Sequence, residues 1–252
     1  MSGHSKWHNI KLKKAKVDAQ RGALFTKLTK EIILATKNGS PDPDANYRLK
    51  MAVEKARENN MPADNIKRAI VRASGADGAR EIEEIRYEGY APAGIAVIVD
   101  VATDNRNRTA SEMRFLFSRH GGTLGETGSV GWIFEPRGLV EVENGSLGED
   151  ALTEAALVDG VVDVRYDDGS HEGRSIVSTE PAALAAVREG LVASGLRVTS
   201  MTLGVEPKQH VAPAPDDIRD VVALLDALEE HEDVQRVYSN VELDAAQLEA
   251  LA

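Results

Sequence analysis

The fold of this chain is indicated most directly by residues 139–204, which have the sequence LVEVENGSLGEDALTEAALVDGVVDVRYDDGSHEGRSIVSTEPAALAAVREGLVASGLRVTSMTLG. Short runs rich in valine alternate in it with longer runs whose apolar residues recur at helical spacing, and turn residues separate the two kinds. We therefore expect strands at Leu139–Val142, Val161–Val164, Gly173–Ser178 and Leu196–Leu203, and helices at Glu149–Leu157 and Pro181–Ala193. The resulting order, βαββαβ, is the split-βαβ or ferredoxin-like pattern.

The residues before this stretch predict part of a second α/β unit. Strands are expected around Ile85 and at Ile95–Val101, and the helix that follows them turns Met113 and Phe117 inward. A Gly-rich loop comes next, and then a strand pair that we expect to turn at Pro136-Arg137-Gly138.

The residues after the stretch complete that second unit. Residues 205–245 predict one more helix and one more strand, Val234–Ser239. Because residues 81–135 lack a second helix and a closing strand, we infer that they form a middle domain together with residues 205–245. Residues 136–204 are then a ferredoxin-like domain inserted in the middle domain.

Residues 1–80 predict a small bundle of three amphipathic helices. The second helix is expected to start after Asp44 and to run to about Asn59, and Pro62 suits the first turn of the third. Inward-facing side chains recur in the three helices at Leu24, Leu28, Ile32 and Ala35, at Leu49, Val53 and Ala56, and at Ile66, Ile70 and Ala73. The expected fold class is α+β, with a three-helix N-terminal domain followed by two α/β domains.

The composition narrows the class of protein. The 252 residues include no cysteine, which excludes disulfides, thiolate metal sites and a cysteine nucleophile. A cysteine-free chain suits a reducing compartment, so we expect the cytoplasm. No apolar run approaches the roughly 20 residues that span a bilayer, and no apolar segment follows the basic N-terminus as it does in a secretory signal. We therefore expect no membrane partner.

Charge is distributed very unevenly along the chain. The whole chain has a net charge of −11, yet residues 1–80 hold 17 Lys and Arg against 8 Asp and Glu. Within the basic N-terminal segment, residues 1–30, seven lysines and one arginine stand against Asp18 alone. A local excess of cations with an aromatic residue, Trp7, on an acidic protein is typical of a surface that binds phosphates. The alternative is a solvated basic face with Trp7 packed on the helical bundle.

Lysine contacts phosphates without reading base sequence, and tryptophan can stack on a base. The candidate contacts in the N-terminal residues are Lys6, Trp7, Lys11, Lys13, Lys14, Lys16, Arg21, Lys27 and Lys30, and the third helix adds Lys67, Arg68 and Arg72.

A second candidate site is the segment 104–109, Asp-Asn-Arg-Asn-Arg-Thr, which joins a strand to a helix. Arg106 and Arg108 lie at the positive end of that helix, where cations are disfavoured unless an anion bridges them. The alternative is an exposed loop whose arginines pair with nearby acids. Thr109 with Glu112 fits a capping box, although Asn105 or Asn107 can also cap this helix.

The remaining motifs give weaker evidence for a functional site. The glycines at 121–128 lack the Gly-Lys-Ser/Thr ending of a phosphate loop and lead into a strand, so we expect a turn that needs positive φ. His4 and His8 have no third ligand nearby, so we expect no metal. No arrangement of nucleophile and base is evident, and we expect neither catalysis nor a cofactor nor a small-molecule substrate.

Five segments, in order, resemble the YebC/PmpR family: GHSKWHNIK, NMPADNIKRAI, YEGYAPAG, TDNRNRTASEMR and HGGTLGETGSVGWIF. They run through nearly all of residues 1–140. The resemblance implies a three-domain, non-enzymatic, cytoplasmic protein that associates with nucleic acid. One departure is Ala91-Pro92-Ala93-Gly94, where the family usually has Gly-Pro-Gly-Gly and where alanine tolerates a positive φ poorly.

Two functions remain open on this basis. Family members are described as transcriptional regulators that bind promoter DNA, and others, including a mitochondrial translational activator of cytochrome c oxidase subunit I, act in translation. The first hypothesis is a DNA-binding transcriptional regulator. The second is a ribosome-associated translation factor that relieves stalling and contacts ribosomal or transfer RNA. The lack of an evident base-reading helix favours the second on physical grounds.

Overall fold

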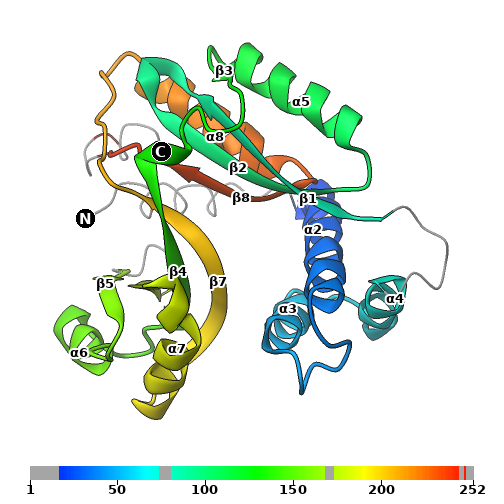
Figure 1. Cartoon of the computed structure of the whole chain (residues 1–252), viewed down its shortest axis with the longest axis vertical. Coiled ribbons are helices and arrows are strands. Elements are labelled where there is room, and N and C mark those ends of the chain that lie inside the picture. The colour runs from blue at the N-terminus through cyan, green and yellow to red at the C-terminus, as the bar shows by residue number, and fades with distance from the viewer. Residues whose placement is uncertain (1–16, 74–80, 168–172, 244–246, 248–252) are drawn as a thin grey trace. The chain divides into compact units, whose positions relative to one another are not determined.

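A computed structural model describes residues 17–73, 81–167, 173–243 and 247 of the chain, with side chains in the first helix described from residue 22 onward (Figure 1). These residues fall into two compact units. The helix–sheet unit holds the described residues up to Trp132 together with Asp216–Ser239, and the split-βαβ unit holds Ile133–Pro215 and described residues after Ser239. The division into three domains with the boundaries given above stays a prediction.

The helix–sheet unit begins with three helices, α2 (Val17–Lys37), α3 (Tyr47–Glu58) and α4 (Ala63–Ala73). The predicted apolar stripe of α2 is buried at Leu28, Ile32 and Ala35 and partly buried at Leu24, because α3 and α4 both pack against this helix, and Ile33 and Leu34 beside the stripe are buried too. Asn46 caps α3 by accepting a hydrogen bond from the backbone N–H of Leu49, while its amide donates to Ala35 O, at 2.7 Å. One side chain thus closes the turn between α2 and α3.

The sheet of this unit has the strand order β3-β1-β2-β8, with every pair antiparallel. Its strands are β1 (Glu83–Tyr90), β2 (Ala96–Thr103), β3 (Thr123–Leu124) and β8 (Val234–Ser239). The helices α5 (Arg106–Arg119) and α8 (Ile218–Glu230) cover one face of it (Figure 1). The chain leaves this unit after residue 132 and returns at residue 216, and its last strand in the unit, β8, completes the sheet by pairing with β2.

Two backbone positions, one in strand β1 and one in the turn between β1 and β2, favour glycine. A Cβ on Gly89 of β1 would lie 2.6 Å from Phe117, so the glycine lets α5 pack closely on the strand. Ala93, in the 3-10 turn η1 (Pro92–Gly94), adopts φ 59°, the conformation that the family's usual glycine accommodates more easily.

The split-βαβ unit has the strand order β5-β6-β4-β7, all antiparallel, with the connectivity that the sequence predicts. Its elements are β4 (Phe134–Glu143), α6 (Glu149–Ala155), β5 (Val161–Arg165), β6 (Arg174–Thr179), α7 (Leu184–Ala193) and β7 (Arg197–Pro207), with short 3-10 turns η2 (Gly131–Ile133) and η3 (Pro181–Ala183). Val140, Val177, Leu152 and Leu191 form a core between the sheet and its two helices. The α+β fold class is confirmed.

One expected turn is wrong. Residues 136–138 do not reverse the chain but lie within the continuous strand β4, which pairs with β7 over its whole length. Pairing with β6 begins only at Gly138, so the strand has a β7 partner but no β6 partner at Pro136. A proline, which lacks a backbone donor, is tolerated where a strand is paired on one side only.

None of the helices in the described residues combines the length and apolar character needed to cross a membrane.

Candidate nucleic-acid interface

The structure describes only part of the predicted interface. Lys6, Trp7, Lys11, Lys13, Lys14 and Lys16 lie outside the described residues, and Arg21 lies in α2 with its side chain outside the description. The described candidates are Lys27 and Lys30 on α2, three cations on α4, and Arg106 and Arg108 at the start of α5.

Lys27 and Lys30 bind the fold itself. The two amines reach the last turn of α8 and the turn that follows it: Lys27 Nζ donates to Glu229 O in the helix, and Lys30 Nζ donates to Glu232 O, two residues past its end, at 3.1 Å. The last carbonyls of a helix lack internal partners and carry partial negative charge, and Lys27 satisfies one of them. Lys30 is 8% exposed and also forms an ion pair with the carboxylate of Asp233. We correct the prediction here, because a buried, paired Lys30 is not available to a phosphate.

Asp233 is the centre of this contact. Arg108 Nη2 lies 2.8 Å from its Oδ2, and Thr109 Oγ1 donates to the same oxygen at 2.6 Å. The side chain of Asp233 is fully buried. Burial alone would raise its pKa, but Lys30, Thr109 and Arg108 outweigh burial and lower the pKa to about 2. We call Lys30, Arg108, Thr109 and Asp233 the Asp233 cluster. It joins α2, α5 and the turn before β8.

The two arginines of segment 104–109 therefore have different roles. Arg108 pairs with Asp233 and lies 3.6 Å from Asp104 and 3.7 Å from Glu112, so the acid-paired alternative holds for it. Arg106 is exposed, and its guanidinium makes no hydrogen bond or ion pair with another described residue. This arrangement does not favour the expected bridging of both arginines by one anion, because Arg108 is already paired with Asp233.

The capping box predicted for α5 is wrong. Asn105, the alternative, is the N-cap and accepts a hydrogen bond from the backbone N–H of Arg108, at 3.2 Å. Thr109 lies inside the helix and is fully buried, with its hydroxyl turned to Asp233. Thr109 does not cap the helix because its hydroxyl donates to the buried carboxylate of Asp233. No signal in the sequence distinguishes Asp233 from the other acids of the chain.

Two of the three cations of α4 face outward. Lys67 and Arg68 are exposed opposite the buried Ile66 and Ala69, and Arg72 is half-buried one turn later. Arg68 is held along the helix, where its Nε donates to Asp64 O at 3.3 Å. These residues remain candidates for phosphate contact.

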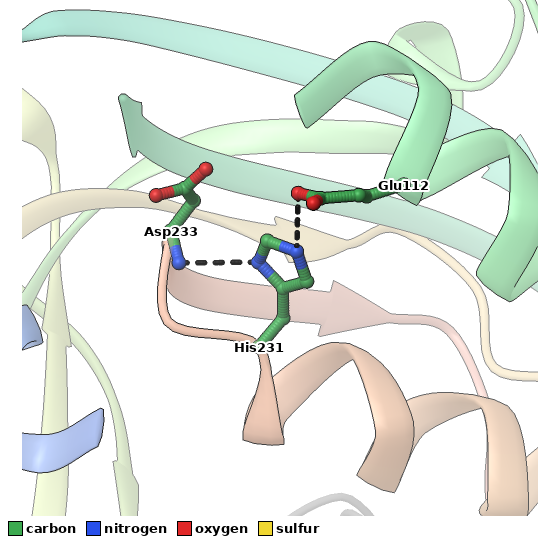
Figure 2. Close-up of side chains that lie close together, drawn as sticks. All are labelled: Glu112, His231 and Asp233. Carbon is green, nitrogen blue, oxygen red and sulfur yellow. Dashed lines mark hydrogen bonds and ion pairs between the residues drawn. The ribbon is translucent and has the colours of Figure 1, made fainter. Parts of the chain in front are cut away.

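Glu112, His231 and Asp233 lie close enough to be considered as metal ligands among the described residues (Figure 2). The His231 ring lies between two of its neighbours: Nδ1 accepts from the backbone N–H of Asp233 at 3.1 Å, which leaves Nε2–H to donate to Glu112 Oε2 at 3.0 Å. Both ring nitrogens are therefore in use, and the Asp233 carboxylate is neutralised by the cations of its cluster. We assign no metal to these residues.

The Gly-rich loop is an anion-binding turn whose anion is internal. Glu88 of β1 accepts backbone hydrogen bonds from Gly128, Val130 and Gly131 at 2.7–2.9 Å. Burial would raise the pKa of Glu88, but these three donors prevail and lower it. Gly128 has φ 90°, as the expected turn requires. The loop therefore does not offer these amides to an external phosphate.

We expect Glu88→Gln to destabilise the helix–sheet unit by about 2 kcal/mol, because a glutamine amide places N–H groups against backbone donors. Glu126→Gln, in the same loop with an exposed side chain, is the matched control. Thermal melts at pH 7 measure the difference. Since the folded pKa of Glu88 is lowered, its stabilisation is present above its unfolded pKa and is lost as the pH falls. Equal melting temperatures for the two variants would contradict this role.

Comparisons with known proteins cover nearly the whole chain. Residues 5–76 match the model of the TACO1/YebC protein N-terminal domain, and residues 82–241 match the model of the TACO1/YebC second and third domain. A protein of Rubrobacter xylanophilus, named probable transcriptional regulatory protein, is 51% identical over 96% of both chains. A protein of the same name from Pelotomaculum thermopropionicum is 48% identical over 97% of this chain and 100% of its own.

A solved structure agrees with the fold. The crystal structure of a conserved hypothetical protein from Aquifex aeolicus superposes with a TM-score of 0.83 at 44% identity, covering 92% of this chain and 94% of that one. Sequence models, full-length relatives and fold thus agree, and the chain belongs to the TACO1/YebC family.

Proposed function

We propose that this chain is a non-enzymatic, nucleic-acid-binding regulator of gene expression that docks its basic N-terminal segment on phosphates. The observation that carries the proposal is the charge contrast: seven lysines and one arginine against one acid in residues 1–30 of a chain with net charge −11. The relatives' shared name, probable transcriptional regulatory protein, supports a regulatory role. DNA is the proposed target, and the cytoplasm is the proposed compartment.

The structure sharpens the set of proposed contacts. Lys27, Lys30 and Arg108 are omitted, because each is used to hold α8 or Asp233 in place. The contacts that remain are Lys6, Trp7, Lys11, Lys13, Lys14, Lys16, Arg21, Lys67, Arg68, Arg72 and Arg106.

A ribosome-associated translation factor is the second candidate. The observation that favours it is the strongly acidic remainder of the chain: residues 81–252 hold 33 Asp and Glu against 13 Lys and Arg. Such a surface repels isolated DNA but suits an assembly that contains both RNA and basic proteins. Sedimentation of cell lysate, before and after nuclease treatment, separates the two: co-migration with ribosomal particles supports the second candidate, and co-migration with DNA that is lost on DNase treatment supports the first.

We expect binding to depend steeply on salt. If the segment contacts several phosphates, log affinity falls with log salt concentration by about 0.9 per contact on duplex DNA and about 0.7 on single strands. Fluorescence anisotropy with a labelled 20-base-pair duplex and a labelled 20-nucleotide strand, between about 50 and 200 mM salt, measures both slopes. A flat response on both probes would remove the phosphate mechanism, and with it the proposed function.

A further inference from the structure

The outer face of α5 carries positive charge, although the chain as a whole is acidic. Thr109, Met113 and Phe117 bury one side of the helix against the sheet. The opposite side is exposed, and it carries Asn107, Ser111, Arg114, Phe115, Ser118 and Arg119, which we call the outer face of α5. It combines cations, an aromatic ring and small polar groups.

Phe115 is the centre of this face. It is 59% exposed, and the guanidinium carbon of Arg119 lies 5.8 Å from its ring centroid. A single exposed apolar residue needs no explanation, and an arginine in the last turn of a helix is favoured by the helix dipole. The combination of an exposed ring with arginines beside it is what points to a ligand, because rings and guanidinium planes both stack on nucleic-acid bases.

The charge of α5 favours a polyanion over a protein. The helix contains four arginines and one acid, Glu112, whose carboxylate is already engaged by His231 and lies near Arg108. Arg106, at the start of the helix, and Arg114 and Arg119 add positive charge to its exposed surface. The fourteen residues of α5 span about 21 Å, the length of about six stacked nucleotides at about 3.4 Å each.

We propose that the outer face of α5 binds single-stranded nucleic acid. Phe115 stacks on an unpaired base, Arg114 and Arg119 contact the flanking phosphates, and Ser118 donates a hydrogen bond to the backbone. This inference rests on the proposed function, and it adds a second contact region with a preference for unpaired strands. Duplex bases are stacked on one another, so they offer no free face to Phe115.

The test is fluorescence anisotropy of the full chain with labelled 20-nucleotide poly(dT), 20-nucleotide poly(U) and a 20-base-pair duplex. Phe115→Ala is expected to weaken single-strand binding by about 5- to 100-fold and duplex binding by less than about twofold. Phe115→Trp restores single-strand affinity, because the indole also stacks. The double variant Arg114→Gln with Arg119→Gln is expected to lose about one to two phosphate contacts. The slope of log affinity against log salt concentration becomes shallower by the corresponding amount.

Matched controls come from the split-βαβ unit. Leu157→Ala removes another exposed apolar side chain, 77% exposed, and Arg197→Gln removes another exposed arginine. Both are expected to bind like the wild type, and circular dichroism confirms that every variant is folded.

The outcomes separate the two proposals. If the wild type binds single strands and Phe115→Ala binds them equally well, this face is not a stacking surface and fits a protein partner instead; the inference falls while the proposed function stands. Binding of the duplex alone has the same consequence. If the wild type binds no probe, both fall.

Discussion

Replacing Lys11 and Lys14 by glutamate weakens nucleic-acid binding by about a hundredfold or more, and adding Lys13→Glu and Lys16→Glu abolishes it. The reason is electrostatic: each lysine that neutralises a phosphate releases a condensed counterion, and each glutamate in its place repels the strand. The acidic remainder of the chain repels the nucleic acid, and the altered segment no longer offsets that repulsion. Anisotropy at about 100 mM salt and retention on a nucleic-acid column measure the loss.

The control for this prediction changes the same charge elsewhere. Arg197→Glu with Lys208→Glu shifts the net charge by as much as Lys11→Glu with Lys14→Glu, but in the split-βαβ unit. If binding depends on a local contact, the affinity of the control pair falls only by the small amount that the change in net charge causes. Equal losses in the two pairs would show that total charge is what matters, and unchanged retention of the quadruple variant would remove the basic N-terminal segment from the interface.

Asp233→Asn is the substitution with the largest expected effect on stability. It leaves Lys30 buried without its counter-charge and turns an amide toward Arg108 and Thr109. Removing one partner of a buried ion pair typically costs about 3–5 kcal/mol. For a chain of this size such a loss lowers the melting temperature by about 6–20 °C. Thermal melts followed by circular dichroism measure it.

Two comparisons make that prediction specific. Asp220→Asn, on the exposed surface of α8, is expected to stay within about 0.5 kcal/mol of the wild type. Arg106→Ala is expected to leave the melting temperature unchanged, whereas Arg108→Ala lowers it, because only Arg108 contacts Asp233. Equal melting temperatures for the Asp233 and Asp220 variants would contradict the central role of the Asp233 cluster.

The pH dependence follows from the same contacts. The pKa of Asp233 is lowered from 3.8 to about 2, so the folded protein holds this proton less tightly than the unfolded chain does. Its stabilisation is fully present above about pH 4 and is lost as the pH falls toward 2. The stability difference between wild type and Asp233→Asn therefore closes across that window.

Much of the fold could be predicted from the local pattern of apolar and turn residues. Apolar residues at spacings of three and four placed α2, α3 and α4, and turn residues between short valine-rich runs placed the strands of the split-βαβ unit. Such periodicities reflect which side of an element faces a core, so they are visible in the sequence of that element alone. The same period turns Phe115 outward once Met113 and Phe117 face inward, and the flanking arginines were the overlooked signal for the outer face of α5.

The roles of individual charges depended on tertiary contacts. Lys30 and Lys27 looked like the other lysines of the basic N-terminal segment, but α2 brings them to the end of α8, about 200 residues away in sequence. Arg106 and Arg108 differ by two positions, yet only one meets Asp233. Likewise, Pro136 marks a turn by composition, while pairing with β7 keeps it in a strand.

Apart from the turn expected at residues 136–138, the sequence was thus sufficient for the kind and order of the predicted elements, and it was sufficient for the charge contrast between residues 1–80 and the rest of the chain, because both are sums over neighbouring residues. It was not sufficient to say which cations are free to meet a phosphate. That depends on whether a carboxylate or a helix end distant in sequence lies within about 3 Å, and only the packing of α2 and α5 around Asp233 decides it.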